Sequence, residues 1–300
     1  MAALRLEART ALPLTEISAF ALRQGEAGTE LIAVGDDDFG VLCVPLSDDG
    51  QLGESKRCDL WRKLPMDVVA SSDGSQFEGV ACDGDGRVLV LQEGPARVLV
   101  LSRRLDTLLH TIRLIVDPDE PDFGEKWHDD DNARGEGMVL LRDGHLLIAK
   151  QRKPIRLIEF GPPGADPLGV SPDTLLPADA SYDVASRDGD VELAVLASWR
   201  LADGEDEDAF ESINDLACDA DGRLFLLSSR ARRIACIEEA LQADESHARF
   251  AEVWDLPDGT PGGDDDRPEA LALPFEGAAL VGIDTKKPGD NVAFIRGVST

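Results

Sequence analysis

The sequence predicts an all-β protein that folds as a single β-propeller, and three observations support this. Short apolar runs rich in Val, Ile and Leu recur between clusters of Gly, Asp and Pro, which is typical of strands. These runs are apolar at successive positions, so each sheet must be covered on both faces, as stacked propeller blades are. The pattern repeats along all 300 residues, and such periodicity outweighs local signals in deciding a fold.

Each repeat begins with an acidic or amide residue placed directly before an apolar run. We call these five residues the markers: Glu16, Glu78, Glu136, Asn214 and Glu269. Successive markers are far enough apart for four short strands and a loop. We therefore predict five four-stranded blades within one domain spanning residues 1–300, with six blades as the alternative.

The first two repeats illustrate the expected strands. After Glu16, apolar runs occupy residues 31–34 and 41–44, with 60–64 as the candidate outer strand. After Glu78, the segment Asp83-Gly84-Asp85-Gly86-Arg87 is a tight-turn signal. It leads to runs at residues 88–91, 98–101 and 108–114.

The last three repeats follow the same order, but the final one is incomplete. The expected strands after the markers are 146–149, 155–158 and 191–199, then 224–227, 234–237 and 251–256, then 279–282 and 292–295. The final repeat lacks an outer strand, whereas residues 4–12 precede the first marker and alternate apolar with polar. We predict that this N-terminal segment completes the last blade, which closes the ring and pairs its edges.

Two long insertions interrupt the repeats, at residues 117–134 and 161–190. Shorter acidic stretches lie at residues 203–211 and 258–266. Acidic runs of this kind are usually solvated loops. A helix within residues 238–249 is weakly indicated.

Composition limits the classes of function. The net charge of −29 makes nucleic acid an improbable partner, because nucleic-acid affinity comes from Lys and Arg on phosphates. No apolar run is long enough to span a membrane, and no secretory signal opens the chain. The five cysteines are odd in number and four of them fall at repeated positions, Cys82 with Cys218 and Cys43 with Cys236, which favours reduced thiols. We expect a cytoplasmic monomer.

The markers define a candidate site. The innermost strand of each blade lines the channel, so the five markers should meet in a ring at one mouth of it. A wider ring on the same face would hold Asp36, Glu93, Gln151, Ser229 and Asp284. Carboxylates held close together repel one another, and a bound cation relieves this. Oxygen ligands favour Ca²⁺, with Mg²⁺ or Mn²⁺ as alternatives. In the structural alternative, the glutamates bond backbone amides of neighbouring blades.

Basic residues cluster in the loops that follow each second strand. In a chain this acidic, they suggest a pocket for an anionic ligand above the metal. The alternative is pairing with nearby acidic loops, which contributes little. The candidate ligand-binding residues are Lys150, Gln151, Arg152, Arg230 and Lys286.

Several phrases resemble the SdiA-regulated protein family, distant relatives of NHL-repeat propellers. They are Phe77-Glu78-Gly79-Val80-Ala81, Gly135-Glu136-Gly137 followed by residues 147–154, and Pro268-Glu269-Ala270-Leu271-Ala272. Gln151 stands where the family has a glutamate. The resemblance covers most of residues 14–296. It implies a five-bladed propeller with a calcium ion and no established reaction.

Two functions therefore compete. The first is a metal-binding propeller that binds a small anionic ligand or a protein. The second is a metal-dependent hydrolase acting on lactones or phosphate esters, since the sequence also looks distantly like gluconolactonase, strictosidine synthase and esterase-like phytase propellers. A hydrolase needs a general base beside the metal. The candidates are Glu93, Asp36 and Asp284.

Overall fold

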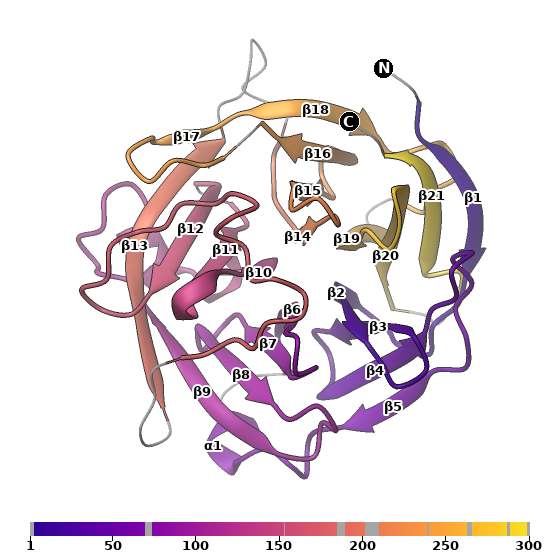
Figure 1. Ribbon diagram of the computed structural model, residues 1–300, viewed down its shortest axis with the longest axis horizontal. Helices are drawn as coiled ribbons and strands as arrows, with labels where there is room; N and C mark the ends of the chain where they lie inside the picture. The colour runs from indigo at the N-terminus through magenta and orange to yellow at the C-terminus, as the bar shows by residue number, and fades with distance from the viewer. Residues whose placement is uncertain are drawn as a thin grey trace.

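A computed structural model describes residues 3–69, 74–152, 154–184, 190–201, 210–238, 240–262, 266–286 and 289–298. Most of the regular structure is β-strand, and the sheets are arranged in a ring around a common axis (Figure 1). Three of the sheets have four strands each. In spatial order, the first sheet contains β2 (Ile17–Gln24), β3 (Thr29–Gly35), β4 (Gly40–Pro45) and β5 (Lys56–Asp59). The second contains β14 (Asp215–Cys218), β15 (Leu224–Ser228), β16 (Arg233–Ile237) and β18 (Phe250–Asp255). The third contains β19 (Asp266–Ala272), β20 (Gly277–Thr285), β21 (Val292–Val298) and β1 (Arg5–Thr10).

The remaining sheet is larger because it consists of two four-stranded meanders joined at their outer strands. Residues 191–194 of β13 (Val191–Leu201) pair in parallel with residues 112–115 of β9 (Leu108–Ile115). The short strand β17 (His247–Ala248) pairs with the C-terminal end of β13. The meanders are β6 (Phe77–Cys82), β7 (Val88–Gln92), β8 (Arg97–Leu101) and β9 (Leu108–Ile115), then β10 (Met138–Leu140), β11 (Leu146–Lys150), β12 (Arg156–Gly161) and β13 (Val191–Leu201).

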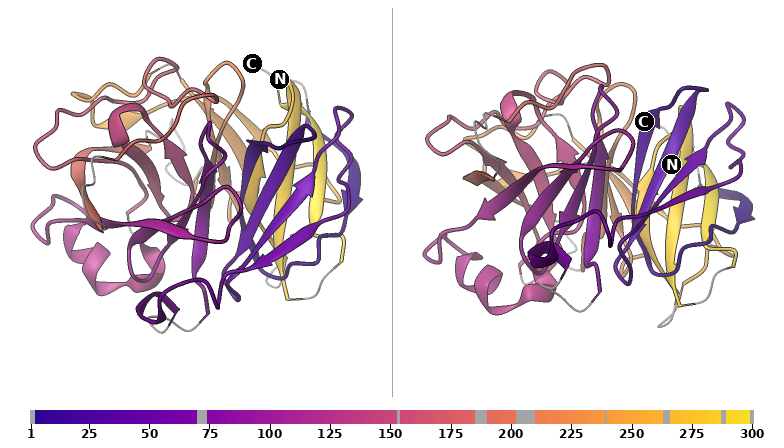
Figure 2. Two further views of the ribbon diagram at one scale, coloured as in Figure 1. Left: turned by 60° about the horizontal axis from the view of Figure 1, so that its bottom comes forward. Right: turned by 90° about the horizontal axis from the view of Figure 1, so that it is seen from below.

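The N-terminal strand closes the ring, as the sequence predicts. β1 pairs antiparallel with β21, from Arg5 opposite Arg296 to Thr10 opposite Val292. The first and last parts of the chain therefore share one sheet, and its outer edge is paired rather than open. Both ends of the described chain lie close together in Figure 2.

The innermost strands β2, β6, β10, β14 and β19 form a closed ring, in which each contacts the next around the axis (Figure 1). The core is distributed between neighbouring sheets rather than gathered in one centre. In β7, for example, Val88 and Val90 pack toward the preceding sheet, while Leu89 and Leu91 pack toward the following one. This two-sided burial explains why the strands read as continuous apolar runs.

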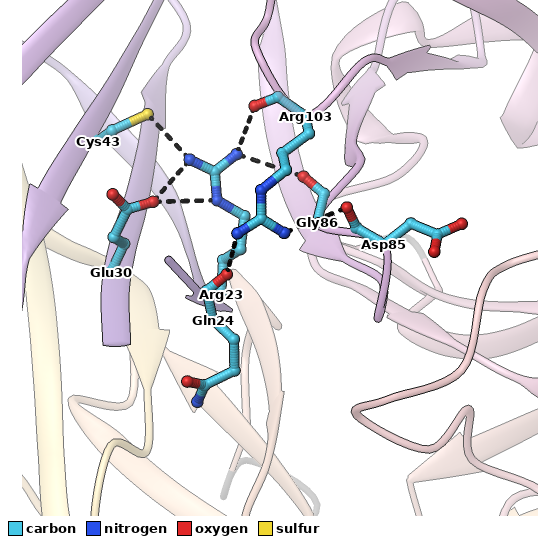
Figure 3. A network of polar contacts seen from close by, with 7 residues as sticks. All are labelled: Arg23, Gln24, Glu30, Cys43, Asp85, Gly86 and Arg103. Atoms are coloured by element: carbon cyan, nitrogen blue, oxygen red, sulfur yellow. Dashed lines mark hydrogen bonds and ion pairs between the residues drawn. The ribbon is translucent and has the colours of Figure 1, made fainter. Parts of the chain in front are cut away.

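Polar contacts also join neighbouring sheets. The Arg23 guanidinium of β2 forms an ion pair with Glu30 at 2.7 Å. It also donates to the Arg103 carbonyl oxygen at 2.9 Å and to the Gly86 carbonyl oxygen at 3.3 Å (Figure 3). Arg103 in turn donates to the Gln24 carbonyl oxygen at 2.6 Å. Two arginines thus tie the first sheet to the β6–β9 meander.

Two of the expected elements are wrong. The outer strand of the first sheet is β5, because residues 60–64 form a turn in which Leu64 donates to the Leu60 carbonyl oxygen. The apolar side chains of Leu60 and Leu64 are buried between neighbouring sheets, which explains the apolar run without a strand. In the described part of residues 238–249 there is no helix, since Leu241 forms a bridge with Val170 and β17 follows.

Short helices occur where none were predicted: α1 (Met66–Val69), α2 (Gly124–Asp129) and the 3₁₀ turns Asp131–Ala133 and Arg142–Gly144. α1 and α2 precede inner strands β6 and β10. The described residues that follow β12, 162–184, lie at the opposite end of the molecule, along the upper edge of both views in Figure 2. We call these residues the strap.

No helix in the described residues is long and apolar enough to cross a lipid bilayer.

Candidate functional site

One marker lies within or directly before each innermost strand. Glu78 is the second residue of β6 and Glu269 is the middle residue of β19, whereas Glu16, Glu136 and Asn214 come just before β2, β10 and β14. Equivalent positions of neighbouring inner strands lie side by side, so the markers gather at one end of the channel that these strands enclose. α1 and α2 lie at this same end (Figure 2).

Three of the marker carboxylates interact directly through their charges. Burial raises the pKa of Glu78 and of Glu136 well above the ordinary value, and the charges of Glu93 and Glu269 raise both further. Burial, followed by the charge of Asp284, raises the pKa of Glu269 to about 8. The structure therefore brings these three acids together.

The wider ring joins the markers. Burial, and then the Glu16 charge, raise the pKa of Asp36 to about 7, and a hydrogen bond links the Asp36 and Glu16 side chains. Two carboxyl groups can share such a bond only when one is protonated. Burial raises the pKa of Glu93 to about 8, against the opposing effect of the Arg134 amide, which donates to its Oε1 at 3.0 Å. The pKa of Asp284 is also raised, chiefly by burial.

These acids line one end of the channel, which we call the acidic mouth. Its members are Glu16, Asp36, Glu78, Glu93, Glu136, Glu269 and Asp284.

Three buried polar atoms in this region have no hydrogen-bond partner in the described structure. They are Asp36 Oδ1, Gln151 Oε1 and Arg152 Nε. Buried polar atoms are nearly always satisfied, so each unsatisfied one calls for an explanation such as a bound ion, water or ligand. Asp36 lies at the acidic mouth. Gln151 and Arg152 directly follow β11, whose C-terminal end lies at the acidic mouth.

Asn214 takes a different role from the other markers. Its side-chain Oδ1 accepts from Ser212 Oγ at 2.8 Å and from the Ser229 amide at 2.9 Å. The Asn214 side chain and the Ser229 backbone amide are therefore hydrogen-bonded to each other, and this bond fixes the loop after β15. Asn214 is 1% exposed, and its side-chain oxygen already accepts two hydrogen bonds, so it is a poor candidate for a metal ligand.

The basic candidates divide into two groups. Lys150 is fully buried, and its Nζ donates to the Arg152 carbonyl oxygen at 2.6 Å. Burial lowers the pKa of Lys150 to about 8, and the Arg152 charge lowers the pKa of both Glu93 and Glu136. Lys150 and Arg152 thus belong to the acidic mouth. Arg230 and Lys286 are exposed at its rim, where Arg230 pairs with Glu211 at 3.9 Å.

Asp215 is the residue that the sequence reasoning missed. It follows Asn214 and is 1% exposed. Its Oδ2 accepts from the Leu271 amide at 2.7 Å and the Phe20 amide at 3.4 Å, while its Oδ1 accepts from the Leu216 amide at 2.8 Å. Burial raises the pKa of Asp215 well above its ordinary value despite these amides. One carboxyl therefore joins β14, β2 and β19 across the channel.

The inner strands pack backbone against backbone at the level of Asp215, which we call the waist. A Cβ added to Gly79 would lie 2.4 Å from the Glu136 carbonyl oxygen, and one added to Gly137 would lie 2.2 Å from the Leu216 amide nitrogen. Both contacts are with backbone, which cannot move aside cheaply. A signal was available in the sequence, because the residue after the marker is Gly79, Gly137 and Ala270 in three repeats but Asp215 in the fourth.

The donor chemistry of the acidic mouth suits a hard cation, since every acid offers carboxylate oxygens and Asp36 Oδ1 is unpartnered. Within the described residues, however, no three His, Cys, Asp or Glu side chains are close enough to hold a metal ion as they stand. The acids interact over longer distances. A cation would therefore have to draw these side chains inward.

Neither a protein-family model nor a curated protein matches the chain, so the SdiA-regulated resemblance stays a prediction. Solved structures do match. Glutaminyl cyclase from Myxococcus xanthus is 13% identical, with 98% of this chain and 96% of that chain covered and a TM-score of 0.55. A streptogramin B lyase is 11% identical (98% and 97% covered, TM-score 0.44), and a putative gluconolactonase is 12% identical (99% and 81% covered, TM-score 0.45).

These proteins are β-propellers. The chain has a β-propeller fold. It follows from the ring of sheets and from the match to the glutaminyl cyclase, which spans nearly the whole of both chains. At this level of identity the match concerns the fold and not the chemistry, since propellers host many unrelated functions.

Proposed function

We propose that this protein is a single five-bladed β-propeller that binds a divalent cation, preferably Ca²⁺, at the acidic mouth. In the count of five, the two meanders of the larger sheet are separate blades. The observation that carries the proposal is the clustering of seven carboxyl groups, in which burial and neighbouring charges raise the pKa of six: Asp36, Glu78, Glu93, Glu136, Glu269 and Asp284. Without a cation they must hold protons near neutral pH, and a bound cation removes that requirement.

The carboxylates of Glu78, Glu136 and Glu269 would hold the ion, since they belong to three inner strands and the charge of Glu269 raises the pKa of the other two. Asp36, with its unpartnered Oδ1, and Glu93 are the nearest further donors. The ion would supply positive charge, and Mg²⁺ or Mn²⁺ would supply the same with stricter geometry. Arg152 already offsets part of the negative charge from one side.

Thermal unfolding tests the proposal. Ca²⁺ should raise the melting temperature of the native protein, and the double variant Glu78→Gln with Glu136→Gln should abolish the rise. The matched control is Glu54→Gln with Glu276→Gln, two exposed glutamates outside the mouth, which should keep the full rise. A melting temperature that saturating Ca²⁺, Mg²⁺ and Mn²⁺ all leave unchanged removes the proposal.

In this proposal the protein acts as a cytoplasmic monomer that binds an anionic small molecule or a protein above the ion. The unpartnered Gln151 Oε1 and Arg152 Nε point to this function, because they are buried donors and acceptors beside the mouth. Arg230 and Lys286 at the rim would extend the contact to a larger partner. Isothermal titration with benzoate, a monocarboxylate that binds free Ca²⁺ weakly, measures the anion binding with and without Ca²⁺.

A metal-dependent hydrolase is the second candidate, and the pKa of Glu93 favours it. A carboxyl group with a pKa of about 8 exchanges protons near neutral pH, as a general acid or base must. Asp36 at about 7 and Asp284 are the alternative bases. Screening lactones and phosphate esters with and without Ca²⁺ distinguishes the two functions. Turnover that requires the ion and is lost in Glu93→Gln identifies an enzyme.

A further inference from the structure

The opposite end of the channel holds a cavity of about 520 Å³. It begins directly below the waist, where the ends of all five inner strands line it, for example Val80–Cys82 of β6 and Leu216–Cys218 of β14. Its volume falls in the range of small-molecule sites, which are concave and mostly apolar with a few polar groups. The acidic mouth and this cavity are separated by Asp215 and the glycine-packed strands, so they are two different sites.

The strap forms one wall of the cavity. Leu175 forms a β-bridge with Leu141, and the Leu176 amide donates to the Leu140 carbonyl oxygen at 3.0 Å. Further along, the Gly84 amide donates to the Ala180 carbonyl oxygen at 2.8 Å. The strap therefore crosses from the third repeat to the second at the end of the channel, and Pro172, Leu175, Leu176, Pro177 and Ala178 face the cavity.

A buried carboxylate holds the beginning of the strap in place. Glu159 of β12 is fully buried and accepts from the Leu168 amide at 2.8 Å and the Gly169 amide at 2.9 Å. The His145 ring lies 2.7 Å away through Nδ1. Val170 then forms a bridge with Leu241 in the fourth repeat. These contacts fix the wall of the cavity, so the apolar space is part of the folded structure.

The walls are chemically inert and apolar. Besides Leu140, Leu176 and Leu273, they include the thiols of Cys82 and Cys218, and burial raises the pKa of both to about 12. These thiols therefore stay neutral at ordinary pH.

Charge occurs at the rim of the cavity, where Asp219 and Asp221 both pair with Arg223, at 2.6 Å and 3.7 Å. Arg142 is the exception. It is exposed, lines the cavity, and has no ion-pair partner among the described residues.

We propose that this cavity binds a small organic anion with an apolar body, such as an aromatic or medium-chain aliphatic carboxylate or sulfonate. The apolar body fills the space between the inner strands and the strap. The anionic group pairs with the Arg142 guanidinium at the rim, since arginine recognises such groups through two parallel hydrogen bonds. This proposal is independent of the cation at the acidic mouth.

Two fluorescent probes with the same aromatic body test the proposal. 1-Anilinonaphthalene-8-sulfonate carries an anionic group, and N-phenyl-1-naphthylamine is the same molecule without it. Titrated into the native protein, both should bind saturably at one site per chain, the sulfonate more tightly. Ala178→Phe places a large side chain into the cavity from an exposed strap position and should weaken both probes at least tenfold. Ala251→Phe, at an exposed position of β18, is the control and should change neither.

The rim arginine is tested separately. Arg142→Gln should weaken the sulfonate about fivefold to tenfold and leave the neutral probe unchanged, whereas Arg62→Gln, another exposed arginine, should affect neither. If Ala178→Phe reduces expression, Ala220→Phe places a large side chain into the cavity from the turn between β14 and β15. Undiminished binding of both probes in a folded cavity-filling variant overturns the site. Equal effects of Arg142→Gln on both probes overturn the assigned anion contact.

Discussion

The Asp215 carboxylate accepts a hydrogen bond from the Leu271 amide, 2.7 Å away, between two inner strands that are 56 positions apart in the chain. A second bond reaches the Phe20 amide, 195 positions away. Inner strands of a propeller have a free edge toward the channel, so their amides need acceptors. Asp215 supplies one acceptor group for three strands at once, and it does so between the acidic mouth and the apolar cavity.

Replacing Asp215 should therefore destabilise the whole ring. We expect Asp215→Ala to lower the free energy of unfolding by about 3 kcal/mol, because it leaves buried amides without acceptors. Asp215→Asn keeps one oxygen and should cost less. Urea denaturation measures both. The control is Asp119→Ala at an exposed loop position, which should change stability by about 0.5 kcal/mol or less. Equal losses for Asp215→Ala and the control would contradict this role.

The waist should tolerate no added methyl group. Gly79→Ala and Gly137→Ala would each press a Cβ into backbone atoms at 2.4 and 2.2 Å, and we expect each to cost about 2 kcal/mol. Gly53→Ala is the matched control, since its nearest contact is the Pro45 Cβ at 3.2 Å on an exposed turn. Thermal unfolding compares the three. If all three variants melt alike, the strands do not pack at the waist as described.

Stability should fall as the pH rises when no divalent cation is present. Folding raises the pKa of Asp36 to about 7 and of Glu93 and Glu269 to about 8, so the folded state holds more protons than the unfolded state between about pH 4 and pH 8. Their contribution is fully present below the unfolded pKa and is lost as the pH rises through the folded pKa.

We therefore expect a lower melting temperature at pH 8 than at pH 5.5 in chelator. Ca²⁺ should stabilise more at pH 8, where the carboxylates are free of protons. The Glu78→Gln and Glu136→Gln double variant should show a shallower pH dependence than the parent protein. A melting temperature that rises steadily from pH 5.5 to pH 8 in chelator would contradict the assignment of raised pKa values.

The buried Glu159 should control the order of the strap. Glu159→Ala removes the acceptor for the Leu168 and Gly169 amides and leaves His145 without its partner, which we expect to cost about 3 kcal/mol. Hydrogen exchange of residues 168–176 should accelerate. Glu192→Ala, on the exposed face of β13, provides the comparison. Unchanged exchange across the strap would show that other contacts hold it.

The fold was predictable because its determinants are local. The middle strands, such as β7, β11 and β15, are buried on both faces. The turn Asp83-Gly84-Asp85-Gly86-Arg87 is encoded within five residues, and the Arg87 amide donates to Asp83 Oδ1 at 2.9 Å. Even the closure by residues 4–12 followed from a missing strand in the last repeat. The prediction of an outer strand at residues 60–64 was wrong, because apolar residues that are buried in a turn give the same sequence pattern as a short strand.

The site was predictable only in part. The gathering of Glu78, Glu136 and Glu269 follows from their equivalent places in the repeat. Asn214 occupies the same place, yet its oxygen is taken by Ser212 and Ser229. That outcome depends on side-chain contacts in the following loop, which periodicity does not encode.

The sequence by itself determined the repeated strands, the ring that they form and the end of the channel at which the five markers lie. These features repeat, and burial on both faces imposes them residue by residue. Only the tertiary structure decided that Asp215 joins three strands at the waist and that the strap encloses an apolar cavity below it. Both depend on single contacts between residues far apart in the chain, such as Gly84 with Ala180, and such contacts leave no periodic trace.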